Sequence, residues 1–350
     1  MRADNLNYPY GIASISGQLK SQAEDFKVTE ELGFKPGGPP GEISQGEHLF
    51  LFIEKTMMTT FDLIEQVARD FSIKPRDIGY SGLKDKVAVT RQWLSLYLPG
   101  QMSCLKIPGT FDYKILEQAW HNKKLRPGTH RSNHFKVVIR GIESCPETTR
   151  QQIEKIRGQG MANYFGEQRF GQRGDNVEQA IRVFSNARRT RKLSRSKKSL
   201  YLSALRSYLF NQVLSTRIEQ GIWDQPLCGD VFMLSGSQSI FYESINNEIL
   251  ERFKQQDIAS TISLYGDGKR LLQTRAKEIE DSVLSEFEII KDCLLQQKAR
   301  LQMRSTRVAV ADLKSEFDEN EGTLHVEARL PRGSYFTTLL DHFIDTGRVR

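Results

Sequence analysis

The chain has 350 residues, 38% of them hydrophobic and 27% charged, which is typical of an ordinary soluble protein with room for two domain cores. No apolar run is as long as a membrane-spanning helix, and the first residues lack the apolar segment of a signal peptide. We therefore expect a cytoplasmic protein with no membrane partner. The four cysteines form no CxxC pair, which argues against a zinc site and against a disulfide framework.

Strand-like and helix-like patterns alternate along the chain. Alternating apolar and polar residues, typical of strands, occupy 47–55, 89–98, 134–142 and 322–330. Helical periodicity occupies 59–71, 200–220, 271–303 and 336–343. The first helix has Thr59 or Thr60 as its cap, and its predicted apolar face consists of Phe61, Ile64, Val67, Ala68 and Phe71.

Sheet-forming segments thus lie toward both ends of the chain, and a helix-rich, basic segment lies between them. This order predicts a split domain, residues 1–158 and 304–350, with a second domain inserted at 159–303.

The positive charge is concentrated in two stretches. Residues 179–218 contain ten Lys or Arg and no acid, and residues 121–140 contain six more without an acid, although the whole chain carries only +7. One such stretch alone is equally compatible with a solvated surface. Two of them in an acid-balanced background favour a phosphate backbone as the partner.

The segment GYSGLKDKVAVTRQWLSL, residues 79–96, places an acid between two lysines on a glycine turn. Gly82 allows a sharp turn, and Lys84 and Lys86 should favour the ionised form of Asp85. A carboxylate of this kind can attack an electrophilic carbon or accept a proton. The alternative is an exposed turn aspartate, because surface ion pairs produce the same pattern.

A second motif, NYFGEQRFGQRG at 163–174, interleaves aromatic residues with Arg169 and Arg173. Aromatic rings beside guanidinium groups suit stacking on unpaired bases and contact with phosphates. A glycine-rich loop over a buried aromatic cluster explains the same pattern. The segment is not a P-loop, since no GKS or GKT follows.

A third motif, LPRGSYFTTLL at 330–340, places Arg332 before a helix and Tyr335 at its first turn. Helix N-termini attract anions, and an aromatic ring there can pack against a base. The alternative is a plain strand–turn–helix connection. His130 and His134 are four residues apart but have no evident third ligand, so we predict no metal site.

Together and in this order, these motifs resemble the tRNA pseudouridine synthase D (TruD) family. The matching segments are EDFKVTEELGF, GEHLFLFIEK, GYSGLKDKVAVTRQWLS, NHFKVVIR, NYFGEQRFG and LPRGSYFTTLL. The resemblance implies an α+β fold. Its catalytic domain would have a central, mostly antiparallel sheet flanked by helices, and the inserted TRUD domain would be helix-rich α/β.

The resemblance also implies an activity, the isomerisation of a uridine in tRNA to pseudouridine, typically position 13 of tRNA(Glu). It gives the catalytic role to Asp85 and an active-site role to Lys20. Residues near the target base would be Phe26, Asn133, Phe135 and Tyr335, where related enzymes often carry Phe at the last position. Arg169 and Arg332 complete the predicted substrate-binding set. An isomerisation needs no cofactor, and no obligate protein partner is evident.

A non-catalytic RNA-binding or RNA-chaperone protein is the alternative, because basic stretches and aromatic residues serve both functions. Asp85 discriminates between them, since a carboxylate that faces a polyanion repels phosphate and is useless to a pure binder.

Overall fold

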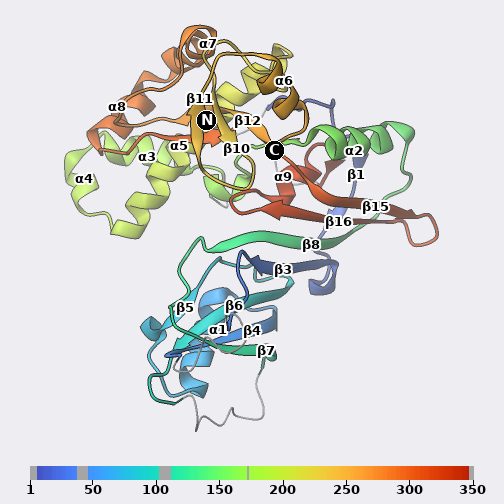
Figure 1. The fold of residues 1–350 in the computed structure, drawn as a ribbon, viewed down its shortest axis with the longest axis vertical. Coiled ribbons are helices and arrows are strands. Elements are labelled where there is room, and N and C mark those ends of the chain that lie inside the picture. The colour runs from blue at the N-terminus through green and yellow to red at the C-terminus, as the bar shows by residue number, and fades with distance from the viewer. Residues whose placement is uncertain (1–5, 38–45, 102–111, 172, 347–350) are drawn as a thin grey trace. The chain divides into compact units, whose positions relative to one another are not determined.

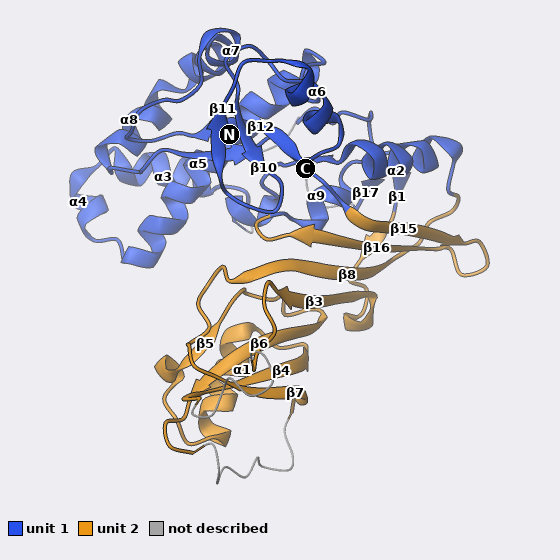
Figure 2. Cartoon of the chain, viewed as in Figure 1, with its two compact units in different colours: residues 1–16, 145–310, 334–350 blue, residues 17–144, 311–333 orange. Residues whose placement is uncertain are grey.

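The structure is a computed structural model that describes residues 6–37, 46–101, 112–171 and 173–346, and its fold is α+β (Figure 1). Two compact units make up the chain (Figure 2). Unit 1 comprises residues 1–16, 145–310 and 334–350, and unit 2 comprises residues 17–144 and 311–333. The expected insertion, 159–303, lies wholly within unit 1. The domain split at 158 and 304 stays a prediction. Unit 1 also includes residues 145–158 and 304–310.

Unit 2 is built on a nine-stranded sheet in the order β15-β16-β8-β3-β6-β4-β7, with β2 added to β8 and β5 added to β6. The strands are β2 (Gln18–Leu19), β3 (Phe26–Leu32), β4 (His48–Thr56), β5 (Ile78–Tyr80), β6 (Val89–Tyr97), β7 (Lys114–His121), β8 (His130–Arg140), β15 (Ala311–Asp318) and β16 (Thr323–Pro331). All neighbours are antiparallel except β3 and β6. The sheet is therefore mostly antiparallel, as expected.

The predicted strand near the C-terminus is confirmed by its burial pattern. In β16 the alternate apolar residues are each no more than 1% exposed: Leu324, Val326, Ala328 and Leu330. β16 pairs along its whole length with β8, from Thr323 opposite Arg140 to Pro331 opposite Ser132. Two segments that lie far apart in the sequence, 130–140 and 323–331, thus become neighbouring strands.

Helix α1 (Thr60–Asp70) is the main helix of unit 2, which also has two short 3-10 turns, η1 (Ala23–Asp25) and η2 (Pro75–Asp77). Thr59 caps α1, because its hydroxyl accepts a hydrogen bond from the Asp62 amide at 3.1 Å. The apolar face packs on strands β4 and β6. One predicted member of that face is wrong, since Phe61 is 55% exposed and lies edge-on to Tyr80.

Unit 1 is rich in helices. They are α2 (Glu147–Gln159), α3 (Asn176–Phe184), α4 (Ala187–Arg191), α5 (Arg195–Glu219), α6 (Asn247–Lys254), α7 (Thr274–Leu284), α8 (Glu288–Gln296) and α9 (Phe336–Leu340), with 3-10 turns η3 (Glu167–Phe170) and η4 (Ser285–Phe287). The core forms around α5. This helix ends before Gly221, whose backbone has the left-handed conformation. The predicted 200–220 helix is thus confirmed and begins earlier.

A four-stranded antiparallel sheet, β11-β10-β12-β13, completes the main body of unit 1. Its strands are β10 (Val231–Leu234), β11 (Ile240–Tyr242), β12 (Ile258–Leu264) and β13 (Gln302–Ser305). Two small sheets pair β1 (Ile15–Ser16) with β17 (Ile344–Asp345) and β9 (Met161–Ala162) with β14 (Arg307–Val308).

The helix-like stretch 271–303 is helical for much of its length but is not one continuous helix. The chain there forms α7, η4 and α8 and then enters β13. The chain tightens into a 3-10 turn at Ser285–Phe287, and the Phe287 ring packs edge-on to Tyr208 of α5. Tertiary packing therefore overrides the helical periodicity. Over the described ranges, no helix is both long and apolar enough to span a bilayer.

Candidate functional site

Asp85 lies in the loop of residues 81–88 that joins β5 to β6 in unit 2. Its carboxylate oxygen Oδ2 is 3.0 Å from the ammonium nitrogen of Lys20. The Asp85 side chain remains 36% exposed and that of Lys20 21% exposed, so the carboxylate is paired and still reachable from solvent. The structure therefore brings together the two residues that the resemblance makes catalytic.

Lys20 has a left-handed backbone conformation, with φ of +61°. For a residue other than glycine this costs on the order of 1–3 kcal/mol, and such residues concentrate at functional sites. The Lys20 ammonium also lies 4.2 Å from the centroid of the Phe26 ring, which is a cation–π contact. Lys20 is thus held between a carboxylate and an aromatic face.

The structure gives Lys84 a different partner from the one expected. Its ammonium is 2.7 Å from Oε2 of Glu30, and the two side chains are 4% and 0% exposed. The other oxygen of Glu30 accepts a hydrogen bond from the Trp93 amide at 3.2 Å. Burial raises the pKa of Glu30, and the charge of Lys84 opposes that rise. Lys84 therefore anchors the loop to β3 and β6 and does not bind the Asp85 carboxylate directly.

Lys55, at the end of β4, is not among the residues predicted from the sequence. It is 1% exposed, and its ammonium donates hydrogen bonds to the backbone oxygens of Met58 and Asp85, the latter at 3.0 Å. Burial lowers the pKa of Lys55 to about 8. A signal was present, because Lys55 continues the inward-facing alternation of Leu49, Leu51 and Ile53.

Phe26, Asn133 and Phe135 come from the adjacent strands β3 and β8. The rings of Phe26 and Phe135 meet edge-to-face at 6.1 Å, and their residues are 1% and 8% exposed. This burial is what a packing role for Phe135 predicts, so its base-stacking role stays a prediction. The side-chain oxygen of Asn133 is buried and has no hydrogen-bond partner. An unsatisfied buried acceptor calls for an explanation, and a donor on a ligand is one.

Arg332 lies at the turn that supports the start of the Asp85 loop. Its guanidinium donates to the carbonyl oxygen of Gly128, whose own amide donates to the backbone oxygen of Ser81 at 2.8 Å. Ser81 also bonds to the ring of His130 at 2.8 Å, and burial lowers the pKa of His130 to about 4. His130 therefore has a polar packing role here.

The second motif lies in unit 1 and forms the buried aromatic cluster that was its alternative interpretation. Tyr164, Phe165 and Phe170 are 1%, 8% and 2% exposed, so they are packed in the core and are not open stacking platforms. Arg169 remains near the surface. It donates to the Tyr335 hydroxyl at 2.6 Å, which gives a partner to the hydroxyl that distinguishes Tyr335 from Phe.

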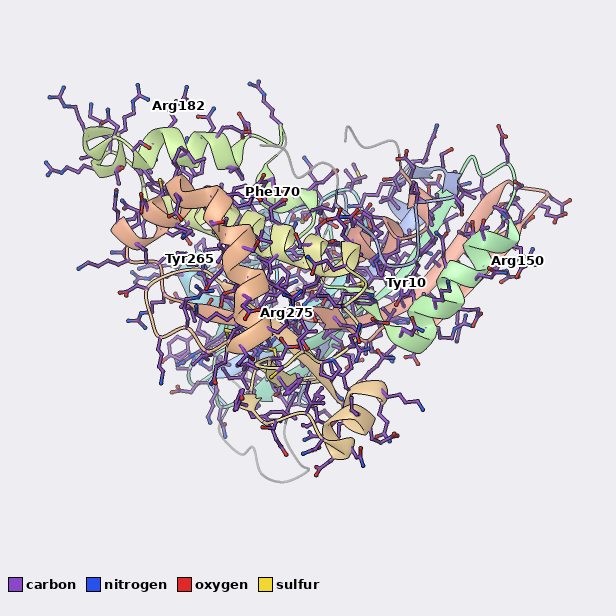
Figure 3. All side chains as sticks on the ribbon, turned by 90° about the horizontal axis from the view of Figure 1, so that it is seen from above. Tyr10, Arg150, Phe170, Arg182, Tyr265 and Arg275 are labelled. Atoms are coloured by element: carbon purple, nitrogen blue, oxygen red, sulfur yellow. The ribbon has the colours of Figure 1, made fainter. Side chains whose placement is uncertain are left out.

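A basic patch, defined as Arg188, Arg189, Arg191 and Lys192, lies on and just after α4. All four residues are exposed, and none forms an ion pair within the described part of the chain. Figure 3 shows side chains that end in nitrogen projecting outward around the labelled Arg182 of α3. One member of the basic stretch behaves differently, since Arg217 is fully buried and paired with Asp230 at 2.9 Å.

The family model described as tRNA pseudouridine synthase D (TruD) matches residues 4–182 and 176–343. The chain belongs to the TruD family. It is 35% identical over 344 residues to tRNA pseudouridine synthase D of Methylococcus capsulatus, which covers 98% of this chain and 95% of the relative. The relative of the same name in Legionella pneumophila strain Lens is 36% identical over 348 residues, with 97% and 99% covered.

A solved structure assigned to tRNA pseudouridine synthase D (TruD) of Methanosarcina mazei has the same fold. The two structures superpose with a TM-score of 0.70 at 20% sequence identity. The superposition covers 98% of this chain and 95% of the Methanosarcina mazei chain. The α+β prediction is thereby confirmed. Membership of the TruD family makes this chain an isomerase of the tRNA pseudouridine synthase type.

Proposed function

We propose that this chain converts uridine 13 of tRNA(Glu) to pseudouridine, with Asp85 as the catalytic residue. The observation that carries the proposal is the Lys20–Asp85 pair at 3.0 Å, and both residues lie within the range that the family model matches. The reaction breaks the N1–C1′ glycosidic bond, turns the uracil and joins its C5 to C1′. The proton from C5 ends on N1, so atoms balance without any added reactant.

Asp85 acts on the ribose in one of two ways. Its carboxylate attacks C1′, or it removes the proton at C2′ to give a glycal. The Lys20 ammonium pairs with the carboxylate at 3.0 Å and fixes its position, and Lys55 donates a hydrogen bond to the backbone oxygen of the same residue at 3.0 Å. A carboxylate gains from fixed geometry because misplacement by about 1 Å costs roughly a hundredfold in rate.

The uracil is proposed to leave the RNA stack and to bind near Phe26, Asn133 and Phe135. Extrusion costs a few kcal/mol, and stacking on an aromatic ring returns about 1–3 kcal/mol per base. The unpartnered oxygen of Asn133 suits the N3–H of uracil, which is a donor. Tyr335 as a stacking residue and Arg169 and Arg332 as substrate-binding residues complete the proposal.

The basic patch on α4 is proposed to contact tRNA phosphates. Such contacts fix the orientation of the RNA and carry no sequence information. The proposal needs no cofactor, places the enzyme in the cytoplasm and requires no protein partner.

The decisive experiment compares Asp85→Asn with the wild type and with Asp77→Asn, a matched change in the same unit at a residue whose nearest ion-pair distance is 4.0 Å. Unmodified tRNA transcripts are incubated in a single-turnover assay, and pseudouridine is mapped chemically. Asp85→Asn should form no product while it still binds tRNA, and Asp77→Asn should match the wild type.

Product formation by Asp85→Asn near the wild-type rate would remove Asp85 from the catalytic role. A wild-type protein that binds tRNA tightly and forms no pseudouridine in any transcript would support the non-catalytic RNA-binding or RNA-chaperone function instead.

A further inference from the structure

Two arginines of unit 1 contact one aromatic ring, and a third arginine lies near the first of them. The guanidinium groups of Arg169 and Arg304 lie 5.4 Å and 4.0 Å from the centroid of the Phe165 ring. Arg206, on α5, is an electrostatic neighbour of Arg169. Each of the three arginines is half-buried. Like charges brought together in a partly desolvated place repel one another, so this arrangement is costly without a compensating anion.

Each of these three arginines donates hydrogen bonds to hydroxyl or amide oxygens. Arg169 donates to the hydroxyls of Ser203 and Tyr335 at 2.9 Å and 2.6 Å. Arg304 donates to the backbone and side-chain oxygens of Asn163 at 3.1 Å and 2.5 Å. Arg206 donates to the side-chain oxygen of Gln302 at 2.6 Å. Hydroxyls and amides orient the guanidinium groups of Arg169 and Arg206 but leave the charge of these two residues uncompensated.

Two further observations point to a missing acceptor. The Nε atoms of Arg169 and Arg206 are buried and have no hydrogen-bond partner. No carboxylate lies within ion-pair distance of either residue, as far as the described ranges extend. Burial, followed by the charge of Arg169, lowers the pKa of Arg206, and burial lowers the pKa of Arg304 to about 10. The fold therefore holds cationic groups against their own electrostatic preference.

We propose that Arg169, Arg206 and Arg304 form a binding site for one phosphodiester group of the RNA substrate. The forked guanidinium matches the oxygens of a phosphate, and neutral partners keep it oriented before the ligand arrives. This phosphate site rests on the proposed function in one respect, which is that the RNA it binds is the tRNA substrate. It gives the Tyr335 hydroxyl a role as well, because that hydroxyl orients Arg169.

The test uses Arg206→Gln, which removes one charge from the site and the hydrogen bond to Gln302. Arg275→Gln on α7 is the control, since the Arg275 side chain is 59% exposed and belongs to the same unit. Binding of a labelled tRNA transcript is measured across a salt titration. Arg206→Gln should lose about tenfold or more in affinity, and its log–log salt slope should fall by roughly 0.7–0.9. Arg275→Gln should match the wild type.

Arg206→Lys keeps the charge and loses the fork, so it should keep the salt slope and lose part of the affinity. In a second arm, inorganic phosphate should raise the melting temperature of the wild type more than that of Arg206→Gln. Should Arg206→Gln fail to fold, Arg169→Gln replaces it with the same expected change in slope.

Equal affinity, slope and phosphate response in Arg206→Gln and the wild type would overturn the inference. Pseudouridine formation by the wild type tests the proposed function separately. If the wild type is active and Arg206→Gln binds tRNA with unchanged affinity and salt slope, only the phosphate site is refuted. An inactive wild type with the expected loss of slope sinks the proposed function and leaves the anion site standing.

Discussion

The buried Glu30–Lys84 pair provides a direct test of how the Asp85 loop is held. Glu30→Gln keeps an acceptor for the Trp93 amide but removes the charge that faces Lys84, whose side chain is 4% exposed. Breaking a buried ion pair at one partner costs about 3–5 kcal/mol, because the other charge is left uncompensated. We expect Glu30→Gln to lose that much of the free energy of unfolding.

Lys84→Met should cost less, about 1–3 kcal/mol, because the remaining Glu30 can take up a proton. Burial raises the pKa of Glu30 in the folded state, so its protonation favours folding as pH falls. The cost of Lys84→Met should therefore shrink from pH 8 to about pH 5. The double variant carries neither charge and should cost less than the sum of the single variants by about 1–3 kcal/mol.

Urea unfolding followed by tryptophan fluorescence measures these differences. Trp223 lies in unit 1, whereas Trp93 and Trp120 lie in unit 2, so a Trp223→Phe background makes the signal report on unit 2 alone. Single-variant costs that add to within about 0.5 kcal/mol in the double variant would refute the reasoning, because additivity means that the pair does not interact.

Four further predictions concern the site and the RNA-binding surface. Replacing the four residues of the basic patch by Ala should weaken tRNA binding and lower the log–log salt slope by roughly 0.7–0.9 for each phosphate that the variant no longer binds; an unchanged titration would mean that the patch faces only solvent. Phe135→Leu should cost less than about 1.5 kcal/mol of stability yet reduce turnover more strongly, whereas normal turnover would assign Phe135 to packing. Single-turnover activity should fall as pH rises through about 8, because Lys55 loses its charge there; the charged groups around it are Asp85, Lys84 and Asp62. The activity of Lys55→Met should not show this fall. Identical pH profiles of the variant and the wild type would show that Lys55 has no part in the pH dependence of activity. Because the pKa of Lys55 is depressed on folding, stability should also rise between about pH 8 and 10.5 in the wild type and not in Lys55→Met.

Local pattern was sufficient for much of the fold. Alternation predicted β16, and a cap followed by helical periodicity predicted α1, because both signals lie within about ten neighbouring residues. The same periodicity failed at 271–303, where contacts with α5 decide where the helices end. The inward position predicted for Phe61 was wrong for another reason. Helical periodicity shows which side of a helix is apolar, but it does not show which residue at the border of that side is buried.

The site depends on contacts between residues far apart in the sequence. Asp85 and its glycine turn stood out locally, but its pairing with Lys20 spans 65 positions and came only from the family resemblance. The flanking Lys84 looked like a partner of Asp85 and is bonded to Glu30, 54 positions away. No spacing rule predicts such pairs, because they depend on which strands become neighbours in the sheet. Lys55 was detectable, since a lysine at an inward position of a strand is rare.

The pairing of β8 between β3 and β16 has a consequence for synthesis. When residue 140 has left the ribosome, β3 is available to β8, but residues 141–322 must still be made before β16 appears. At about 5–20 residues per second, the second edge of β8 stays open for on the order of 10–40 s. An open edge invites pairing with other nascent chains, and the exposed Arg131 and Lys136 oppose this by charge repulsion. The strand that carries Asn133 and Phe135 thus has one unpaired edge until residues 323–331 have been made.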